Sequence, residues 1–520
     1  MRKTRASVRV FLFLHILDLF SLPSTLAATS KEDQSQHQRT FAICTATQKA
    51  PSLIRWLRAR TIQPMGIGIK SRVLLQYAEA RTPNLQIKTQ RLEPRRAIRK
   101  QMTFSKIGRI ASALVATAAL GLGMTACGGG TIGYLWSLGT YYNQISGFKI
   151  DSYTGNLTAI DHAPFSSGGV NPVLAVLKPG GRYLYVINNG TAGSGTVGTP
   201  GYVAPVSGSI AEFAVGGGGV LTFQQNFFSQ GTNSIYATLD GSGNFLYVLD
   251  KFGPNYNAVS NPNGSITAFS IAADTGRLTL VPNTTILNPN GTPTNFFAVG
   301  ANPIMSKIGG GNCLFTLSPN SIYPYSISGN GQLTIATTGP YLVPGSQSLT
   351  SINTSAGTSA GTFTYLTDGA ANQIFSLQAG GTACSLSPIS GSQQNNLPGA
   401  SNPVNSITTQ NGRYLYVLNQ VQTGQQSTST SSISAFFING NGQIQQLAGS
   451  DGQNPYAVGA GPVCAVQDPT NQYLFISNSL DNTVTGKIID QNHGYLANLT
   501  RGSVFSVTKT PTCLVSSPNV

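Results

Sequence analysis

The chain has 520 residues and a formal net charge of +15, but the charge is confined to one end. Residues 1–101 hold 19 of the 31 Lys and Arg and 5 of the 16 Asp and Glu, whereas residues 102–520 are nearly neutral and hold 57 of the 59 glycines. A Gly-rich, charge-poor composition excludes a coiled coil, a helical bundle and a basic nucleic-acid surface on this larger part. The main domain, which begins at residue 127, has no run of 18 apolar residues, so no membrane-spanning helix is predicted in it.

Two export signals follow each other near the N-terminus. Residues 1–28 resemble a secretory signal, with basic residues before an apolar run and alanines after it. Residues 102–126 resemble a bacterial lipoprotein signal, because Lys106 and Arg109 precede an apolar stretch that ends just before Cys127. In such signals the peptide is cut before the cysteine, whose thiol is lipidated. We therefore expect lipidation at Cys127, attachment to a lipid bilayer, and a location in the cell envelope, at the outer membrane or periplasmic face.

The two stacked signals conflict, since cleavage before Cys127 would remove everything upstream. We interpret residues 1–101 as translated upstream sequence from a misplaced start codon, which makes Met102 the true start and residues 127–520 the mature domain. The alternative is a genuine Arg-rich extension that binds an anionic surface. N-terminal sequencing of the native protein distinguishes the two.

A four-part unit then recurs seven times. Its clearest element is a short apolar strand whose third residue aligns as Trp136, Tyr185, Tyr247, Phe315, Tyr365, Tyr416 and Phe475. Each repeat also has a leading strand, beginning near Pro172, Ser234, Pro303, Ser348, Pro403, Pro462 and Pro511. A β-branched strand and a strand after a Gly turn complete the unit. Four short strands with period-2 patterning predict four-stranded antiparallel sheets, and seven such sheets form a β-propeller.

The chain ends predict how this ring closes. Between Cys127 and Tyr134 there is no room for a leading strand, whereas the last segment, PTCLVSSPNV, is a leading strand with nothing after it. We therefore expect an all-β, seven-bladed β-propeller over residues 127–520, closed by the C-terminal strand in the first blade. Closure removes the open sheet edges that would template aggregation. We expect a monomer.

Loop lengths point to one face of the ring. With the strands called A to D from the inside out, the A-to-B and C-to-D turns are short. The B-to-C connections are long at residues 189–208, 251–264 and 421–431, and so is the D-to-A connection at residues 281–302. Elaboration of one face of a rigid scaffold predicts the binding face. Drift in unconstrained Gly/Ser loops is the alternative.

Polar residues end most B strands on that face. Three residues after each aligned position stand Gly139, Asn188, Asp250, Ser318, Asp368, Asn419 and Asn478. A ring of such oxygen atoms would suit a hydroxylated ligand or a hard cation, so the candidate ligand-binding residues are Asn188, Asp250, Lys251, Asp368, Asn419 and Asn478. The alternative is that these residues form local turns with the backbone. No His/Cys cluster has metal-ligand spacing, and we predict no metal site and no cofactor.

Four cysteines remain in the domain: Cys313, Cys384, Cys464 and Cys513. An exported compartment permits disulfides, and four thiols allow three pairings. Cys464 and Cys513 occupy matching places in the leading strands of neighbouring blades, so this pair is expected to approach. Adjacent inner strands diverge from the axis, and this divergence decides whether the distance between the two cysteines is short enough for a disulfide.

The repeat phrases resemble one known family. Asn-Pro pairs open three leading strands, the phrases GGRYLYVINN and NGRYLYVLNQ combine a turn with a strand, and SIxxFxI phrases are followed by GxLT. In these features residues 131–520 resemble the lactonase-like seven-bladed propellers, which include the 6-phosphogluconolactonase and muconate-lactonizing groups and the YVTN-repeat surface proteins. These phrases contain the residues that form strands and turns, and not catalytic residues, so the resemblance implies the fold more than an activity.

The resemblance also implies where an active site would lie. The family's enzymes are similar to one another in an Arg-His pair after the Pro of a leading strand and a Glu after the Asn that ends the next strand. No leading strand here has Arg or His at those positions, and Gln420, the nearest counterpart of the Glu, cannot act as a carboxylate base. His162, which we expect in the D-to-A connection of the first blade on the elaborated face, is the other candidate catalytic residue, with an isolated surface histidine as the alternative.

Two classes of function stay open. We favour a cell-envelope binding or scaffold module for a glycan, peptide or surface protein, because a neutral, hydroxyl-rich face with Tyr202 and Tyr256 in its loops suits contacts that do not depend on charge. The alternative is a lactonase that hydrolyses a sugar lactone. Without the family's Arg, His and Glu, efficient hydrolysis of 6-phosphogluconolactone is not expected.

Overall fold

The structure is a computed structural model that describes residues 130–519, except 195–198, 200–203, 205, 289, 311, 337–338, 356–361, 382, 421–430 and 448–452. These residues belong to one compact unit, Gly128–Val520. The two expected signals, Cys127 and Tyr202 lie outside the described residues. Within the described part, no helix has the length and apolar character needed to cross a membrane.

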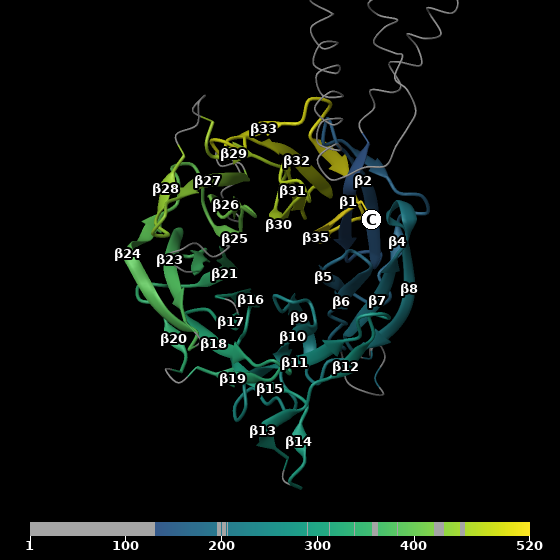
Figure 1. The fold of residues 1–520 in the computed structure, drawn as a ribbon, viewed down its shortest axis with the longest axis vertical. Coiled ribbons are helices and arrows are strands. Elements are labelled where there is room, and N and C mark those ends of the chain that lie inside the picture. Colours follow the sequence, from purple (N-terminus) through teal and green to yellow (C-terminus); the bar gives the residue numbers. More distant parts are fainter. Residues whose placement is uncertain are drawn as a thin grey trace, which may run out of the picture. The chain divides into compact units, whose positions relative to one another are not determined.

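Seven antiparallel sheets stand around a central axis and confirm the predicted β-propeller (Figure 1). We number them blades 1 to 7, and the strands below are given in that order, so that blade 1 contains β35, β1 and β2. The innermost A strands are β35 (Pro511–Pro518), β5 (Pro172–Leu177), β9 (Thr232–Leu239), β16 (Met305–Gly309), β21 (Leu349–Thr354), β25 (Pro403–Thr408) and β30 (Pro462–Gln467). The B strands are β1 (Thr131–Gly139), β6 (Tyr183–Asn188), β10 (Phe245–Phe252), β17 (Cys313–Leu317), β22 (Thr362–Asp368), β26 (Tyr414–Asn419) and β31 (Tyr473–Asn478). The C strands are β2 (Gln144–Asp151), β7 (Ser209–Val215), β11 (Asn263–Ile271), β18 (Ser321–Ile327), β23 (Gln373–Gly380), β27 (Ser432–Ile438) and β32 (Thr483–Ile489).

The outermost D strands are of two kinds. In blades 2 and 5 they are continuous, as β8 (Leu221–Phe227), which follows the 3₁₀ turn η1 (Gly217–Gly219), and β24 (Ser385–Asn395). In the other blades two short pieces pair with the C strand: β3 (Leu157–Ala159) and β4 (Phe165–Ser166), β12 (Leu278–Leu280) and β15 (Phe297–Ala301), β19 (Leu333–Ile335) and β20 (Tyr341–Leu342), β28 (Ile444–Gln446) and β29 (Tyr456–Ala457), and β33 (Leu496–Asn498) and β34 (Val504–Ser506).

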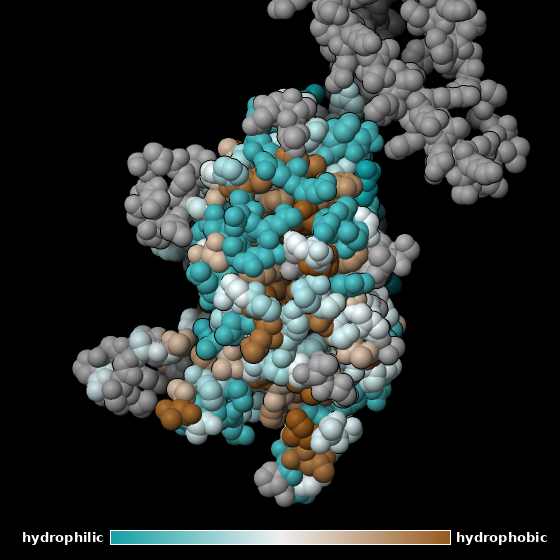
Figure 2. All heavy atoms as spheres, turned by 90° about the vertical axis from the view of Figure 1, so that its left-hand side faces the viewer, coloured by the Kyte–Doolittle hydropathy of each residue, from teal (hydrophilic) through white to brown (hydrophobic). Residues whose placement is uncertain are grey.

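This interruption of the outer strands corrects two predicted placements. His162 lies between β3 and β4, which both pair with β2, so it is at the outer edge of blade 1 and not on the elaborated face. In the predicted connection 281–302, residues 281–296 form an insertion between the two pieces of the outer strand of blade 3, with the hairpin β13 (Asn283–Leu287) and β14 (Pro293–Thr294) projecting outward (Figure 1). The exposed Ile286 and Leu287 belong to this hairpin, and the lower end of the molecule in Figure 2 is accordingly apolar.

The C-terminal strand closes the ring, as the sequence predicts. Strand β35 pairs with β1 in a register that places Val515 opposite Trp136. It also contacts β30 on one side and β5 on the other, so the inner strands form a continuous circle. Leu514 and Val515 are buried, which makes this strand part of the core and not a frayed end.

The aligned B-strand residues hold neighbouring blades together. All seven are buried, and five donate a hydrogen bond to a carbonyl in the C-to-D turn of the next blade: Trp136 to Gly219, Tyr185 to Gly276, Tyr247 to Gly331, Tyr365 to Gly442 and Tyr416 to Gly494. Burial raises the pKa of the Tyr247 and Tyr365 hydroxyls, which keeps them protonated as donors. Gly442 must be glycine, because its φ is +83° and a Cβ there would lie 2.3 Å from the Phe363 ring.

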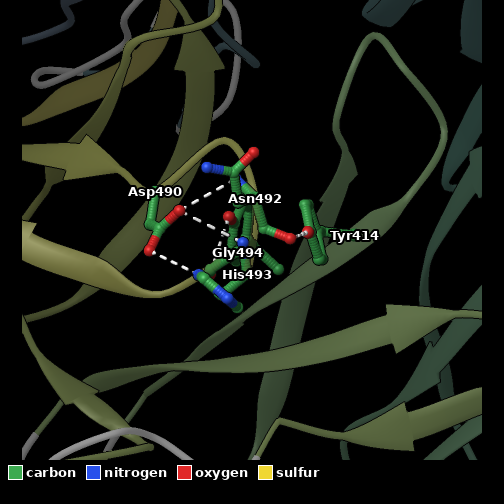
Figure 3. A network of polar contacts seen from close by, with 6 residues as sticks. Tyr414, Asp490, Asn492, His493 and Gly494 are labelled. Atoms are coloured by element: carbon green, nitrogen blue, oxygen red, sulfur yellow. Dashed lines mark hydrogen bonds and ion pairs between the residues drawn. The ribbon is translucent and has the colours of Figure 1, made fainter.

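Figure 3 shows one of these junctions, between blades 6 and 7. The Tyr414 hydroxyl donates to the carbonyl oxygen of Asn492 at 2.5 Å. Asp490 accepts the backbone N–H groups of Asn492 and His493 at 2.8 and 3.1 Å and lies 3.0 Å from His493 Nδ1. Burial opposes ionisation of Asp490, but these hydrogen bonds prevail and lower its pKa. His493 therefore shapes a turn.

Candidate functional site

A cavity of about 250 Å³ lies between blades 2 and 3 on the elaborated face. The B-to-C connection of blade 2 supplies one wall, and the segment that leads from β8 into β9 supplies the rest. The lining residues are Ser207, Gly208, Phe228, Ser229, Gly231, Thr232, Asn233 and Ser234. Among the described residues of the long connections, only those in blade 2 contribute to this cavity, through Ser207 and Gly208.

The Asp250 carboxylate lies beneath this cavity, fully buried. Ser229 and Ser234, which both line the cavity, donate their hydroxyls to Asp250 Oδ1 at 2.7 Å each. On the other oxygen, Oδ2 accepts the Gly231 N–H at 3.2 Å and the Thr267 hydroxyl at 3.3 Å. The carboxylate thus organises the cavity floor through hydroxyl groups.

Gly231 and Asn233 let the chain pass close to this carboxylate. A Cβ at Gly231 would lie 2.6 Å from Asp250 Cβ, so no other residue fits there without displacement. Asn233 has φ +59°, the left-handed conformation that Asn tolerates, and its side chain accepts the Asn189 amide at 2.7 Å. The same left-handed Asn precedes other leading strands, at Asn171, Asn302 and Asn402. This conformation accounts for the recurring Asn at these positions.

Burial gives Asp250 an unusual titration. It raises the pKa to about 6, although the hydrogen bonds from Ser229, Ser234, Gly231 and Thr267 oppose the shift. Because the pKa in the folded protein exceeds the unfolded value, the corresponding stability is present below the unfolded pKa and is lost as the pH rises through about 6. Keeping Asp250 ionised at pH 7 therefore costs the folded protein about 3 kcal/mol. A pKa raised in this way beside a cavity makes Asp250 a candidate functional residue.

The other candidate residues at B-strand ends are buried and hydrogen-bonded within the propeller. Asn188, Asp368, Asn419 and Asn478 are all buried. Asn188 donates to the Ser167 carbonyl, Asn419 to the Ser434 hydroxyl and Asn478 to the Thr485 hydroxyl. Asp368 accepts the backbone N–H groups of Gln347, Ser348 and Ala371. These contacts support the interpretation that the residues satisfy nearby polar groups, and they do not place a ring of oxygens at the channel mouth.

The two candidate catalytic residues and Lys251 are not brought together. Gln420 donates its amide to the Pro462 carbonyl at 2.9 Å and so joins blade 6 to blade 7. His162 is exposed at the outer edge of blade 1. Lys251 places its ammonium over the Phe252 ring, 5.8 Å from the centroid. His162 and Gln420 therefore lie in different blades, the first and the sixth.

Both disulfides of the structure join neighbouring blades. Cys464 and Cys513, the expected pair, are bonded between the inner strands of blades 7 and 1 with a Cα–Cα distance of 5.1 Å. Cys313 and Cys384 are bonded between blades 4 and 5 at 5.5 Å. These are the two junctions at which the aligned B-strand residue is Phe315 or Phe475, neither of which can donate a hydrogen bond.

Sequence reasoning missed most of the cavity. Asp250 was identified from its position, but Phe228, Ser229 and Ser234 were not, because the FFSQGTNS segment has the composition of an ordinary connection. The available signal was Gly231 three residues before Ser234, which resembles the spacing of Gly169 before Pro172. Both glycines pack against the polar residue that ends the B strand.

Comparisons with known proteins agree with the fold. No family model matches the chain, and no curated protein sequence matches it. Among solved structures, it is similar to a periplasmic gluconolactonase of Pseudomonas aeruginosa (15% identity, TM-score 0.55, 75% of this chain and 100% of that one). It is also similar to a candidate 6-phosphogluconolactonase of Bacteroides uniformis (16%, 0.54, 74% and 99%) and to a protein of Lactobacillus plantarum (16%, 0.54, 75% and 100%). At these identities the likeness concerns the fold.

Proposed function

We propose that this propeller is an exported binding module that takes a hydroxylated ligand, such as a glycan, in the cavity between blades 2 and 3. The observation that carries the proposal is the lining of the cavity. It combines the hydroxyls of Ser207, Ser229 and Thr232 and the amide of Asn233 with the ring of Phe228, which is 58% exposed. An apolar ring beside several donors and acceptors is the combination that binds sugars.

The two disulfides support an oxidising compartment, and one protein of similar fold is periplasmic. Lipidation at Cys127 would hold the domain at a membrane by acyl chains. The module would then present its elaborated face to polymers of the cell envelope. A peptide or a surface protein is the alternative occupant of that face.

Replacing Ser229 by Ala tests the proposal. We expect the purified protein to bind members of a glycan panel, and Ser229→Ala to weaken that binding about 5- to 10-fold, the effect of one lost hydrogen bond. Ser270 is a half-buried serine on β11 of blade 3, and Ser270→Ala is the matched control, which should bind as the wild type does. Binding to no glycan, or equal affinity of both variants, would contradict the proposal.

A lactonase is the second candidate, favoured by the similarity of the fold to a gluconolactonase and by the Ser229–Asp250 pair beside a cavity. One assay distinguishes the lactonase from the binding module. Turnover of gluconolactone above spontaneous hydrolysis, abolished by Asp250→Asn, would assign an enzyme. Turnover no faster than spontaneous hydrolysis, with glycan binding intact, would assign the binding module.

A further inference from the structure

We infer that the cavity between blades 2 and 3 selects a hydroxylated ligand that carries a protonated amine, such as an amino sugar or an aminopolyol, over its neutral and acidic counterparts. This inference rests on the proposed function and names its ligand class. The carboxylate of Asp250 beneath the cavity and the hydroxyl of Ser229 above it carry the argument.

The first step concerns charge. Every group that faces the Asp250 carboxylate is neutral: the Ser229 and Ser234 hydroxyls and the Gly231 N–H from the segment leading into β9, and the Ser265 and Thr267 hydroxyls from β11. The neighbouring Lys251 directs its ammonium over Phe252. Among the described residues, the ion pairs are Lys149–Asp161 and His493–Asp490, so Asp250 has no cationic partner. When ionised, it leaves an uncompensated negative charge below the cavity.

The second step concerns the direction of the hydroxyl protons. A serine hydroxyl has one proton and two lone pairs. Ser229 gives its proton to Asp250, so its oxygen offers lone pairs to the cavity that it lines. A ligand that brings N–H donors and a positive charge satisfies both the lone pairs and the carboxylate. A ligand carboxylate would meet lone pairs and a like charge.

The third step concerns pH. Asp250 touches no solvent and acts through Ser229, which makes it a positioning residue. Its pKa of about 6 means that the carboxylate changes from mostly neutral to mostly ionised between pH 5 and pH 7.5. A cationic ligand requires the ionised form, so its affinity should rise about tenfold over that interval. A neutral polyol should show little change.

Three open-chain hexitol derivatives test the inference, because they share a carbon skeleton and differ in charge. N-methylglucamine stays protonated at both pH values, sorbitol is neutral and gluconate is anionic. We expect the purified protein at pH 7.5 to bind N-methylglucamine on the order of tenfold more tightly than sorbitol, and gluconate least, with dissociation constants from NMR titration. Only the N-methylglucamine affinity should fall at pH 5.

Asp250→Asn supplies the decisive variant. Asn occupies the equivalent position in three blades, as Asn188, Asn419 and Asn478, so the site should accommodate it. We expect it to bind N-methylglucamine and sorbitol alike at both pH values, and Ser229→Ala to lose the same preference. Asp274→Asn, on an exposed turn of the same blade, removes an equal charge and should leave the preference intact.

The outcomes separate the two proposals. If sorbitol binds in a Ser229-dependent way but N-methylglucamine binds no more tightly, the ligand class proposed here is wrong and the binding module stands. If the preference survives in Asp250→Asn, the carboxylate is not its source and the inference is overturned. If no hexitol binds, the ligand class proposed here is wrong, and the glycan panel alone decides whether the binding module stands.

Discussion

Removing residues 511–520 should cost at least about 5 kcal/mol of unfolding free energy, which is a large share of the stability of a typical domain. The deletion takes away the inner strand of blade 1, with the buried Leu514 and Val515, each worth about 1.5–3 kcal/mol. It also removes Cys513 and hence a disulfide worth about 2–5 kcal/mol. The edge of β1 is left open. Thermal unfolding followed by circular dichroism measures the effect.

Two controls separate the strand from the disulfide. The double variant Cys464→Ser and Cys513→Ser keeps β35 and should lose only the disulfide contribution. A synthetic peptide of residues 508–520 should restore the truncated protein by adding back the missing strand, even if that protein is poorly folded alone. A truncated protein that melts at the wild-type temperature would show that the ring does not depend on this strand.

Removing the disulfide between blades 4 and 5 should cost about 2–5 kcal/mol, whereas removing the hydroxyl from an equivalent junction should cost about 1 kcal/mol. At this junction Phe315 provides no hydrogen bond to the next blade, so Cys313 and Cys384 supply the link that Tyr365 supplies between blades 5 and 6. The test compares Cys313→Ala combined with Cys384→Ala against Tyr365→Phe in urea unfolding under oxidising conditions.

Reduction of the wild type provides the control for this comparison. Dithiothreitol should lower the unfolding midpoint at least as far as the double alanine variant, because it breaks both disulfides. Dithiothreitol should leave unchanged the difference in unfolding midpoint between the wild type and Tyr365→Phe. Equal midpoints for the wild type and the double variant would mean that packing around Phe315 holds the junction without the disulfide.

The fold could be predicted from the sequence because its information is local and repeated seven times. The aligned residues from Trp136 to Phe475 mark the buried B strands, and the lone C-terminal strand identifies the partner of β1. The outer strands were predicted less well, since most of their interrupted pieces have only two or three residues and so show no readable period. His162 was therefore placed on a connection when it lies between two halves of an outer strand.

The candidate site could be predicted only in part, for a related reason. Asp250 stands at a position that its repeats make visible, but its burial and its lack of a cationic partner depend on hydroxyls from two other segments. Such contacts join residues that share no period or spacing. The same holds for Cys313 and Cys384, which lie 71 residues apart and meet because blades 4 and 5 are neighbours.

The central claim is that a ligand binds in the cavity between blades 2 and 3, and filling that cavity tests it most directly. Ser207→Trp places a large side chain in the cavity wall at an exposed loop position, whereas Gln224→Trp places the same residue on the exposed outer strand of blade 2. The measurement is the dissociation constant of each variant for the tightest ligand of the wild type. The account predicts that Ser207→Trp weakens binding more than tenfold and that Gln224→Trp leaves it unchanged. Undiminished binding by a folded Ser207→Trp variant would contradict the account and place the ligand elsewhere on the propeller.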